Sequence, residues 1–172
     1  MNNMIFMSQS GLTDASREHE WDAWYVEHLR IMRTVPGISS AQRFKTESRG
    51  HSPSLAMYTI ASAAVFQDPY YQSVRGMGDW LPLIQKQHYR RNLFEGLDQA
   101  PDVAQDCVLI VADRDSPADL PRVALTWLKC AGIDHSTPYR GIAVVKSDVA
   151  GTAAGRGNIA VYRPVTAGAT RR

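Results

Sequence analysis

A histidine lies among aromatic residues at helical spacing near the start of the chain. His28 follows Tyr25 by three residues and Trp24 by four, so in a helix the three side chains share one face. An imidazole has an ordinary pKa of about 6.5 and can take or give a proton at working pH. We therefore predict that His28 transfers a proton, that Tyr25 assists, and that Trp24 contacts the substrate. The alternative is a packed histidine bonded to a neighbouring backbone or carboxylate group.

Tyr58 and Arg43 are the next candidates, each on a predicted strand. A Tyr58 hydroxyl turned into the same space would stabilise negative charge on a carbonyl oxygen. The alternative is an aromatic core residue with a tethered hydroxyl. Arg43 would hold a substrate carboxylate through two N–H groups. Because side chains alternate along a strand and Phe44 prefers the core, the alternative is an Arg43 exposed to solvent.

A second polar cluster lies near residue 90, at the start of a predicted strand. We predict that His88 and Tyr89 contact the substrate, with His88 as a second acid or base. Trp80 would form a stacking wall beside them. The alternative is that this cluster is the solvated end of an element.

The sequence gives no motif for a metal or a nucleotide cofactor. No HxxxH or HxH pattern occurs, and Cys107 and Cys130 have no ligand partner at a suitable spacing. Neither a GxGxxG after a strand nor a GxxxxGK[ST] is present. We therefore expect no cofactor and no metal, and we expect the two cysteines to be buried free thiols.

Composition favours a soluble globular protein of the cytoplasm. The 172 residues include 19 Lys and Arg against 17 Asp and Glu, which gives no strongly basic surface for nucleic acid. No apolar run approaches the ~20 residues of a membrane span. The first residues, MNNMIFMSQSG, lack the basic segment and long apolar core of a secretory signal. We predict no nucleic-acid partner and no membrane partner.

The elements that position these side chains follow from periodicity and breakers. The helix that carries His28 ends at Val35-Pro36-Gly37, because proline cannot continue it and glycine accepts a left-handed stop. A second helix is predicted to start at Ser116-Pro117 and to end at Gly132. Alternation and apolar runs predict strands over 5–7, 40–47, 55–61, 89–97, 108–111, 141–146 and 158–165.

The two halves of the chain read as unequal copies of one β-α-β-β unit. Aligned on the glycines that end the two helices, the second copy has Val123 where the first has His28. The predicted fold is α+β: two tandem ferredoxin-like β-α-β-β units, with antiparallel sheets and helices on one face. Residues 1–100 would hold the polar cavity, and residues 101–172 would form a shorter, degenerate second unit.

Several short segments resemble the dimeric α/β-barrel superfamily of ferredoxin-like proteins, and the EthD-like proteins in particular. They are Trp24-Tyr25 with Glu27-His28, Val35-Pro36-Gly37-Ile38, Ala41, Arg43-Phe44 and Asp68-Pro69-Tyr70. The resemblance covers residues 4–97 well and the remainder only as a degenerate copy. It implies a cavity between sheet and helices, completed by pairing of sheets within the chain or between chains. We expect a homodimer.

The predicted function is that of a cofactor-independent lyase or isomerase. Its substrate would be a small carbonyl or hydroxy organic acid, or an aromatic metabolite, with His28 moving the proton. Members of the superfamily differ in reaction, and some use haem, for which His28 or His88 would be the ligand. The alternatives are a non-catalytic small-molecule binding protein and a cofactor-free aromatic monooxygenase.

Overall fold

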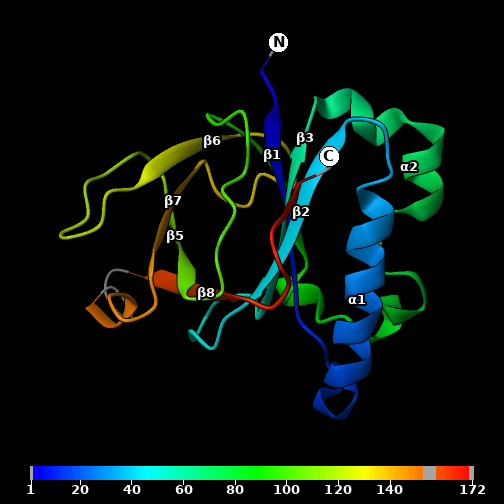
Figure 1. The fold of residues 1–172 in the computed structure, drawn as a ribbon, viewed down its shortest axis with the longest axis horizontal. Coiled ribbons are helices and arrows are strands. Elements are labelled where there is room, and N and C mark those ends of the chain that lie inside the picture. The colour runs from blue at the N-terminus through cyan, green and yellow to red at the C-terminus, as the bar shows by residue number, and fades with distance from the viewer. Residues whose placement is uncertain (1, 153–157, 171–172) are drawn as a thin grey trace.

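The strands of this protein close into one antiparallel barrel, shown in Figure 1. The computed structural model describes residues 2–152 and 158–170. Neighbouring strands follow the order β3-β1-β4-β6-β7-β5-β8-β2, and β2 pairs with β3 to complete the ring. The strands are β1 (Met4–Ser10), β2 (Ile38–Lys45), β3 (Ser54–Ile60), β4 (Arg90–Glu95), β5 (Cys107–Arg114), β6 (Thr126–Ile133), β7 (Tyr139–Lys146) and β8 (Ile159–Pro164). A two-residue strand, β9 (Ala169–Thr170), pairs with β2 beyond the end of β8.

The helices lie outside the barrel, beside the strands of the first half (Figure 1). The long helix α1 (Glu18–Met32) presents a buried stripe that includes Trp21, Tyr25 and His28. The short helix α2 (Pro69–Val74) starts with its N-cap, Asp68, whose side chain accepts a hydrogen bond from the backbone of Tyr71. The described residues also form five short 3₁₀ helices: η1 (Ala15–Arg17), η2 (Ala63–Gln67), η3 (Gly78–Leu83), η4 (Lys86–His88) and η5 (Ala150–Thr152). No helix in the described residues is long and apolar enough to cross a membrane.

Strand alternation divides the buried side chains between two main cores. On β1, Ile5 and Met7 point into the barrel, while Phe6 points outward to the layer beneath α1. On β3, Leu55 points into the barrel and Tyr58 points outward. A strand with both faces covered is buried along its whole length, and every residue of β3 is buried. The barrel is therefore packed inside, and α1 forms a second layer on its outside.

The predicted fold class, two tandem ferredoxin-like units with helices on one face, is wrong. The strands form a single closed barrel, because β4 pairs with β6 and β2 pairs with β8. The helix predicted between Ser116 and Gly132 is absent, since residues 126–133 form β6. Pro121 lies inside the predicted helix, where its ring would break the hydrogen-bond ladder. The division of the chain at residue 100 stays a prediction.

The strands predicted for the first half agree with the structure, as does the helix that carries His28. Three predicted strands of the second half also occur, as β5, β7 and β8. The prediction of two copies of one β-α-β-β unit would make the last strands of the two copies, β3 and β8, equivalent, but they occupy different places in the barrel. β3 lies between β1 and β2, whereas β8 lies between β5 and β2.

Candidate functional site

A small cavity lies between α1 and the outer face of the barrel. Its volume of about 20 Å³ is room for about one water molecule. Side chains from α1, β1, β3 and β4 border it, together with the irregular segment between β3 and β4. The lining residues are Phe6, Ser8, Tyr25, His28, Met32, Tyr58, Tyr71, Gly76, Met77, Tyr89 and Arg91. A cavity is therefore present between the helix and the strands, although it is very small.

His28 is the most unusual side chain in this lining. Its ring stacks on Trp24, with centroids 4.6 Å apart and planes 12° apart, and it meets Tyr25 edge-on. Only 8% of the residue is exposed, and burial lowers the pKa of His28 to about 4. Within the part of the chain that the structure describes, neither ring nitrogen has a hydrogen-bond partner. The imidazole is therefore neutral at pH 7 and keeps an unused donor and an unused acceptor.

The tyrosines around His28 are held in their protonated form. Burial raises the pKa of Tyr25 to about 12, and burial likewise raises the pKa of Tyr58 well above its ordinary value. The hydroxyl of Tyr71 accepts a hydrogen bond of 2.9 Å from the Arg91 guanidinium. Protonated phenols donate hydrogen bonds, so the cavity offers donors to an oxygen atom of a ligand.

Arg43 is buried beneath α1 instead of facing solvent. Its guanidinium lies 4.6 Å from the centre of the Trp21 ring and 4.2 Å from that of Tyr25. It donates to Asp22 at 2.7 Å and to Ser54 at 3.0 Å. The alternative of an exposed Arg43 is wrong, because the closed barrel and α1 cover both faces of β2 and bury Arg43 and its neighbour alike. Arg43 does not border the cavity.

The second predicted cluster is divided by the fold. Tyr89 borders the cavity, but His88 and Trp80 do not. Trp80 is buried in the helix layer, where the Arg17 guanidinium lies 4.7 Å above its ring. His88 belongs to η4, and its backbone carbonyl accepts a hydrogen bond from Ser52. The structure thus brings Tyr25, His28, Tyr58 and Tyr89 together, with Trp24 stacked on His28.

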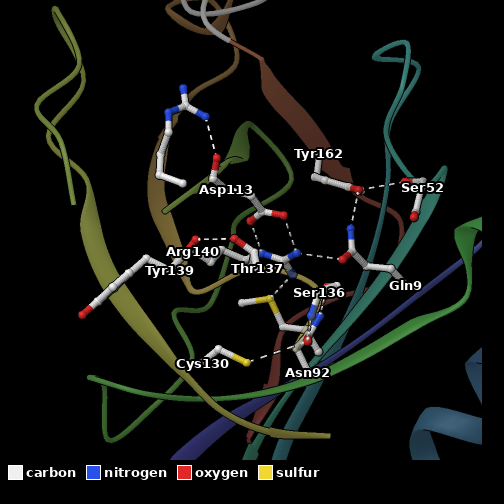
Figure 2. Close-up of polar contacts among 12 residues, drawn as sticks. Gln9, Ser52, Asn92, Asp113, Cys130, Ser136, Thr137, Tyr139, Arg140 and Tyr162 are labelled. Atoms are coloured by element: carbon white, nitrogen blue, oxygen red, sulfur yellow. Dashed lines mark hydrogen bonds and ion pairs between the residues drawn. The ribbon is translucent and has the colours of Figure 1, made fainter. Parts of the chain in front are cut away.

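A polar network that sequence analysis missed occupies one mouth of the barrel (Figure 2). The Arg140 side chain, 1% exposed, donates to both carboxylate oxygens of Asp113 at 2.7 and 2.9 Å. It also donates to Gln9 at 2.9 Å, and Gln9 donates to the Tyr162 hydroxyl at 3.0 Å. Tyr162 donates in turn to the backbone carbonyl of Ser52 at 2.7 Å. These bonds fix a charged group inside an otherwise apolar barrel.

The alternation of the strands carries a signal for this network. On β5, Asp113 continues the inward face that Leu109 and Val111 begin. On β1, Gln9 continues the inward face of Ile5 and Met7 in the same way. A polar residue that extends an apolar period-2 pattern at a strand end therefore indicates a polar barrel mouth.

Neither site is built for a metal or a haem. Among the described residues, no group of three or more His, Cys, Asp or Glu side chains could hold a metal ion. A haem bound through His28 does not fit the cavity of about 20 Å³, since pockets for ligands of ordinary size have ~300–1,000 Å³. The stacked Trp24 also covers one face of the imidazole. His88, the other candidate haem ligand, does not border the cavity.

Comparison with known proteins identifies the fold and no family. No family model matches the chain, and no curated protein matches it. The chain is similar to a protein solved as "Crystal structure of Putative Chlorite dismutase TA0507", with a TM-score of 0.58, 9% identity and 96% of each chain covered. Such a likeness shows a shared fold alone. The EthD-like resemblance and the homodimer stay predictions.

Proposed function

We propose that this protein binds a small aromatic or hydroxylated metabolite in the cavity beneath α1. One observation carries the proposal: the buried His28 imidazole borders the cavity and has no hydrogen-bond partner in the described residues. The ring nitrogens are not among the fully buried, unpaired side-chain atoms of the described residues, so the imidazole keeps some contact with solvent that a ligand would replace. A ligand hydroxyl or carbonyl would supply the missing bond, and the aromatic lining suits a flat apolar ligand body.

The cavity has room for about one water molecule, so a ligand enters only if lining side chains move, and Met77 is the one that we propose moves. It is 4% exposed and belongs to the irregular segment before β4. It lies between Gly76, with φ 89°, and Gly78, with φ 54°. Glycine adopts positive φ without steric cost, and a Cβ at Gly76 would meet nothing within 4 Å. The backbone on either side of Met77 therefore has room to turn and let the side chain swing out.

Proton transfer by His28, as in a cofactor-independent lyase or isomerase, is the second candidate. The neutral imidazole is in its proton-accepting form, and the Tyr25 and Tyr58 hydroxyls are available as donors to an oxyanion. A pKa of about 4 makes the imidazole a weak base, and no carboxylate among the residues that the structure describes forms a hydrogen bond with it. These two features are why we rank binding before catalysis.

A thermal-shift screen of aromatic and hydroxy-acid metabolites tests the binding proposal. Three proteins are compared: wild type, His28→Phe and Met77→Ala. A bound ligand raises the melting temperature of wild type, because it stabilises the native state alone. The stabilisation should shrink in His28→Phe, which keeps the ring but loses both nitrogens, and should grow in Met77→Ala, which enlarges the cavity. Equal shifts in wild type and His28→Phe would rule out His28 as the binding group.

Analysis of the ligand after incubation separates binding from catalysis. A ligand recovered unchanged supports a binding protein. A ligand consumed by wild type and ~10²–10⁴-fold more slowly by His28→Phe supports acid–base catalysis. Oxygen uptake during consumption would instead indicate the cofactor-free monooxygenase.

A further inference from the structure

The mouth of the barrel holds a second, larger pocket on the opposite face of β1 from His28. Its volume is about 220 Å³, roughly ten times that of the cavity beneath α1. Charged and polar side chains from β4, β5 and the adjoining loops form its wall. The residues that the argument uses are His51, Arg90, Asp113, Arg114 and Asp115.

The floor of this pocket is rigid and electrically neutral. Asp113 accepts two hydrogen bonds from Arg140, which is itself held by Gln9 (Figure 2). The Arg140 guanidinium also lies 5.1 Å from the centre of the Phe94 ring. The Asp113 side chain is 37% exposed, so one side of its carboxylate faces the pocket. A floor fixed by several bonds needs no rearrangement when a ligand binds.

Charges of both signs remain at the rim. Arg90 opens β4 and continues the inward alternation of Asn92 and Phe94, yet its guanidinium has no ion pair or hydrogen bond in the described residues. The Arg114 guanidinium donates to the backbone carbonyl of Asp113 at 2.7 Å. Asp115 supplies a carboxylate at the same rim. The pocket therefore presents cationic donors beside carboxylate acceptors.

We infer that the barrel mouth binds a small carboxylic acid with a hydrogen-bond donor on its α-carbon, that is, an α-amino or α-hydroxy acid. The ligand carboxylate would pair with Arg90, and its ammonium or hydroxyl group would donate to Asp113 or Asp115. A simple anion would meet the repulsion of these two carboxylates without compensation, and a simple cation would meet that of the guanidinium groups. His51 belongs to the loop before β3 and borders the same pocket, and burial lowers the pKa of its imidazole below the ordinary value.

A nuclear magnetic resonance titration of the full chain tests this inference. Glycine and L-lactate are the probes, and acetate and methylammonium are the controls that carry one charged group each. Glycine or lactate should shift the backbone amide signals of residues 113–115 and 135–138 and leave those of 24–28 unchanged. Acetate and methylammonium should bind at least about tenfold more weakly, since each lacks one of the two paired groups.

Two matched variants assign the binding to the pocket. Arg90→Gln should weaken binding of glycine and lactate about tenfold, and it should fold normally because the residue is exposed. Arg30→Gln, on the outer face of α1, should leave the affinity unchanged. Equal affinity for acetate, an unaffected Arg90→Gln variant, or no shift at the mouth with any probe would each overturn the inference. His28 lies on the other side of β1, so the His28→Phe variant tests ligand binding in the cavity beneath α1 independently of the barrel mouth.

Discussion

Acidification should destabilise this protein through His28 in particular. Burial holds the pKa of His28 at about 4 in the folded chain, whereas the unfolded chain restores the ordinary value of about 6.5. Below pH 6.5 the unfolded state therefore binds a proton that the folded state does not. The contribution to stability is fully present above pH 6.5 and is lost as the pH falls toward about 4.

The size of the effect follows from the two pKa values. Between about pH 7.5 and about pH 4.5, proton linkage at one such group removes about 2.5 kcal/mol from the free energy of unfolding. Total stabilities of domains are about 5–15 kcal/mol, so the loss is measurable by urea unfolding followed by circular dichroism. Other acidic and basic groups also contribute to the pH dependence of the wild type. The informative quantity is thus the difference between wild type and His28→Phe at each pH.

His28→Phe removes the titrating nitrogens and keeps an aromatic ring to stack on Trp24. Over that pH range, the free energy of unfolding of the wild type should fall by about 2.5 kcal/mol more than that of the variant. This holds whatever the stability of the variant at about pH 7.5. If the two stability curves run parallel, His28 takes up its proton equally well in the folded protein. The imidazole would then be as well hydrated as in the unfolded chain, and the argument that burial lowers its pKa would be wrong.

Two further predictions concern the barrel and a turn. Asp113→Ala leaves the buried Arg140 charge unpaired and should cost about 3 kcal/mol, a fall of about 6–12 °C in melting temperature. Asp106→Ala, which breaks an exposed pair just before the same strand, should leave the melting temperature unchanged. Gly37→Ala should lower the free energy of unfolding, measured in urea, by at least about 2 kcal/mol. The reason is that φ at Gly37 is 91° and a Cβ there would lie 2.7 Å from the Cγ2 atom of Val65 in η2. Gly50→Ala, with φ 80° and open space, should cost about 1 kcal/mol, and equal losses at the two glycines would contradict the steric argument.

The helix layer of this protein could be predicted from the sequence because its signals are local. The stripe through Tyr25 and His28 repeats at helical spacing, and Pro36 and Gly37 end the helix close to where the structure ends it. The strands that flank it carry alternating or continuous apolar patterns. Four lining residues of the cavity were therefore identifiable. Tyr71 and Met77 were not, since the segment between β3 and β4 has no sustained periodicity.

Barrel closure was not predictable by the same reasoning, because it depends on pairings between distant strands. Nothing in the pattern of β4 indicates that its partner is β6, nearly forty residues further along the chain. A period-3 apolar pattern over residues 120–131 resembled a helix, although Pro121 argued against one. Once those residues form β6, its edge closes on β4, and no second helix is needed to cover a separate sheet. The mouth network depends on this closure, because Gln9 and Arg140 meet only across the barrel.

The two sites lie on opposite faces of one strand, and this arrangement decides how far they influence each other. Ser8 borders the cavity beneath α1, and its neighbour Gln9 belongs to the mouth network. β1 is hydrogen-bonded along its length to β3 on one side and to β4 on the other, so neither ligand can shift it without disturbing two ladders. Interiors packed this closely resist graded deformation. A ligand bound at the barrel mouth should therefore leave the affinity of the cavity beneath α1 for its own ligand unchanged. The shared strand β1 separates the two sites and does not couple them.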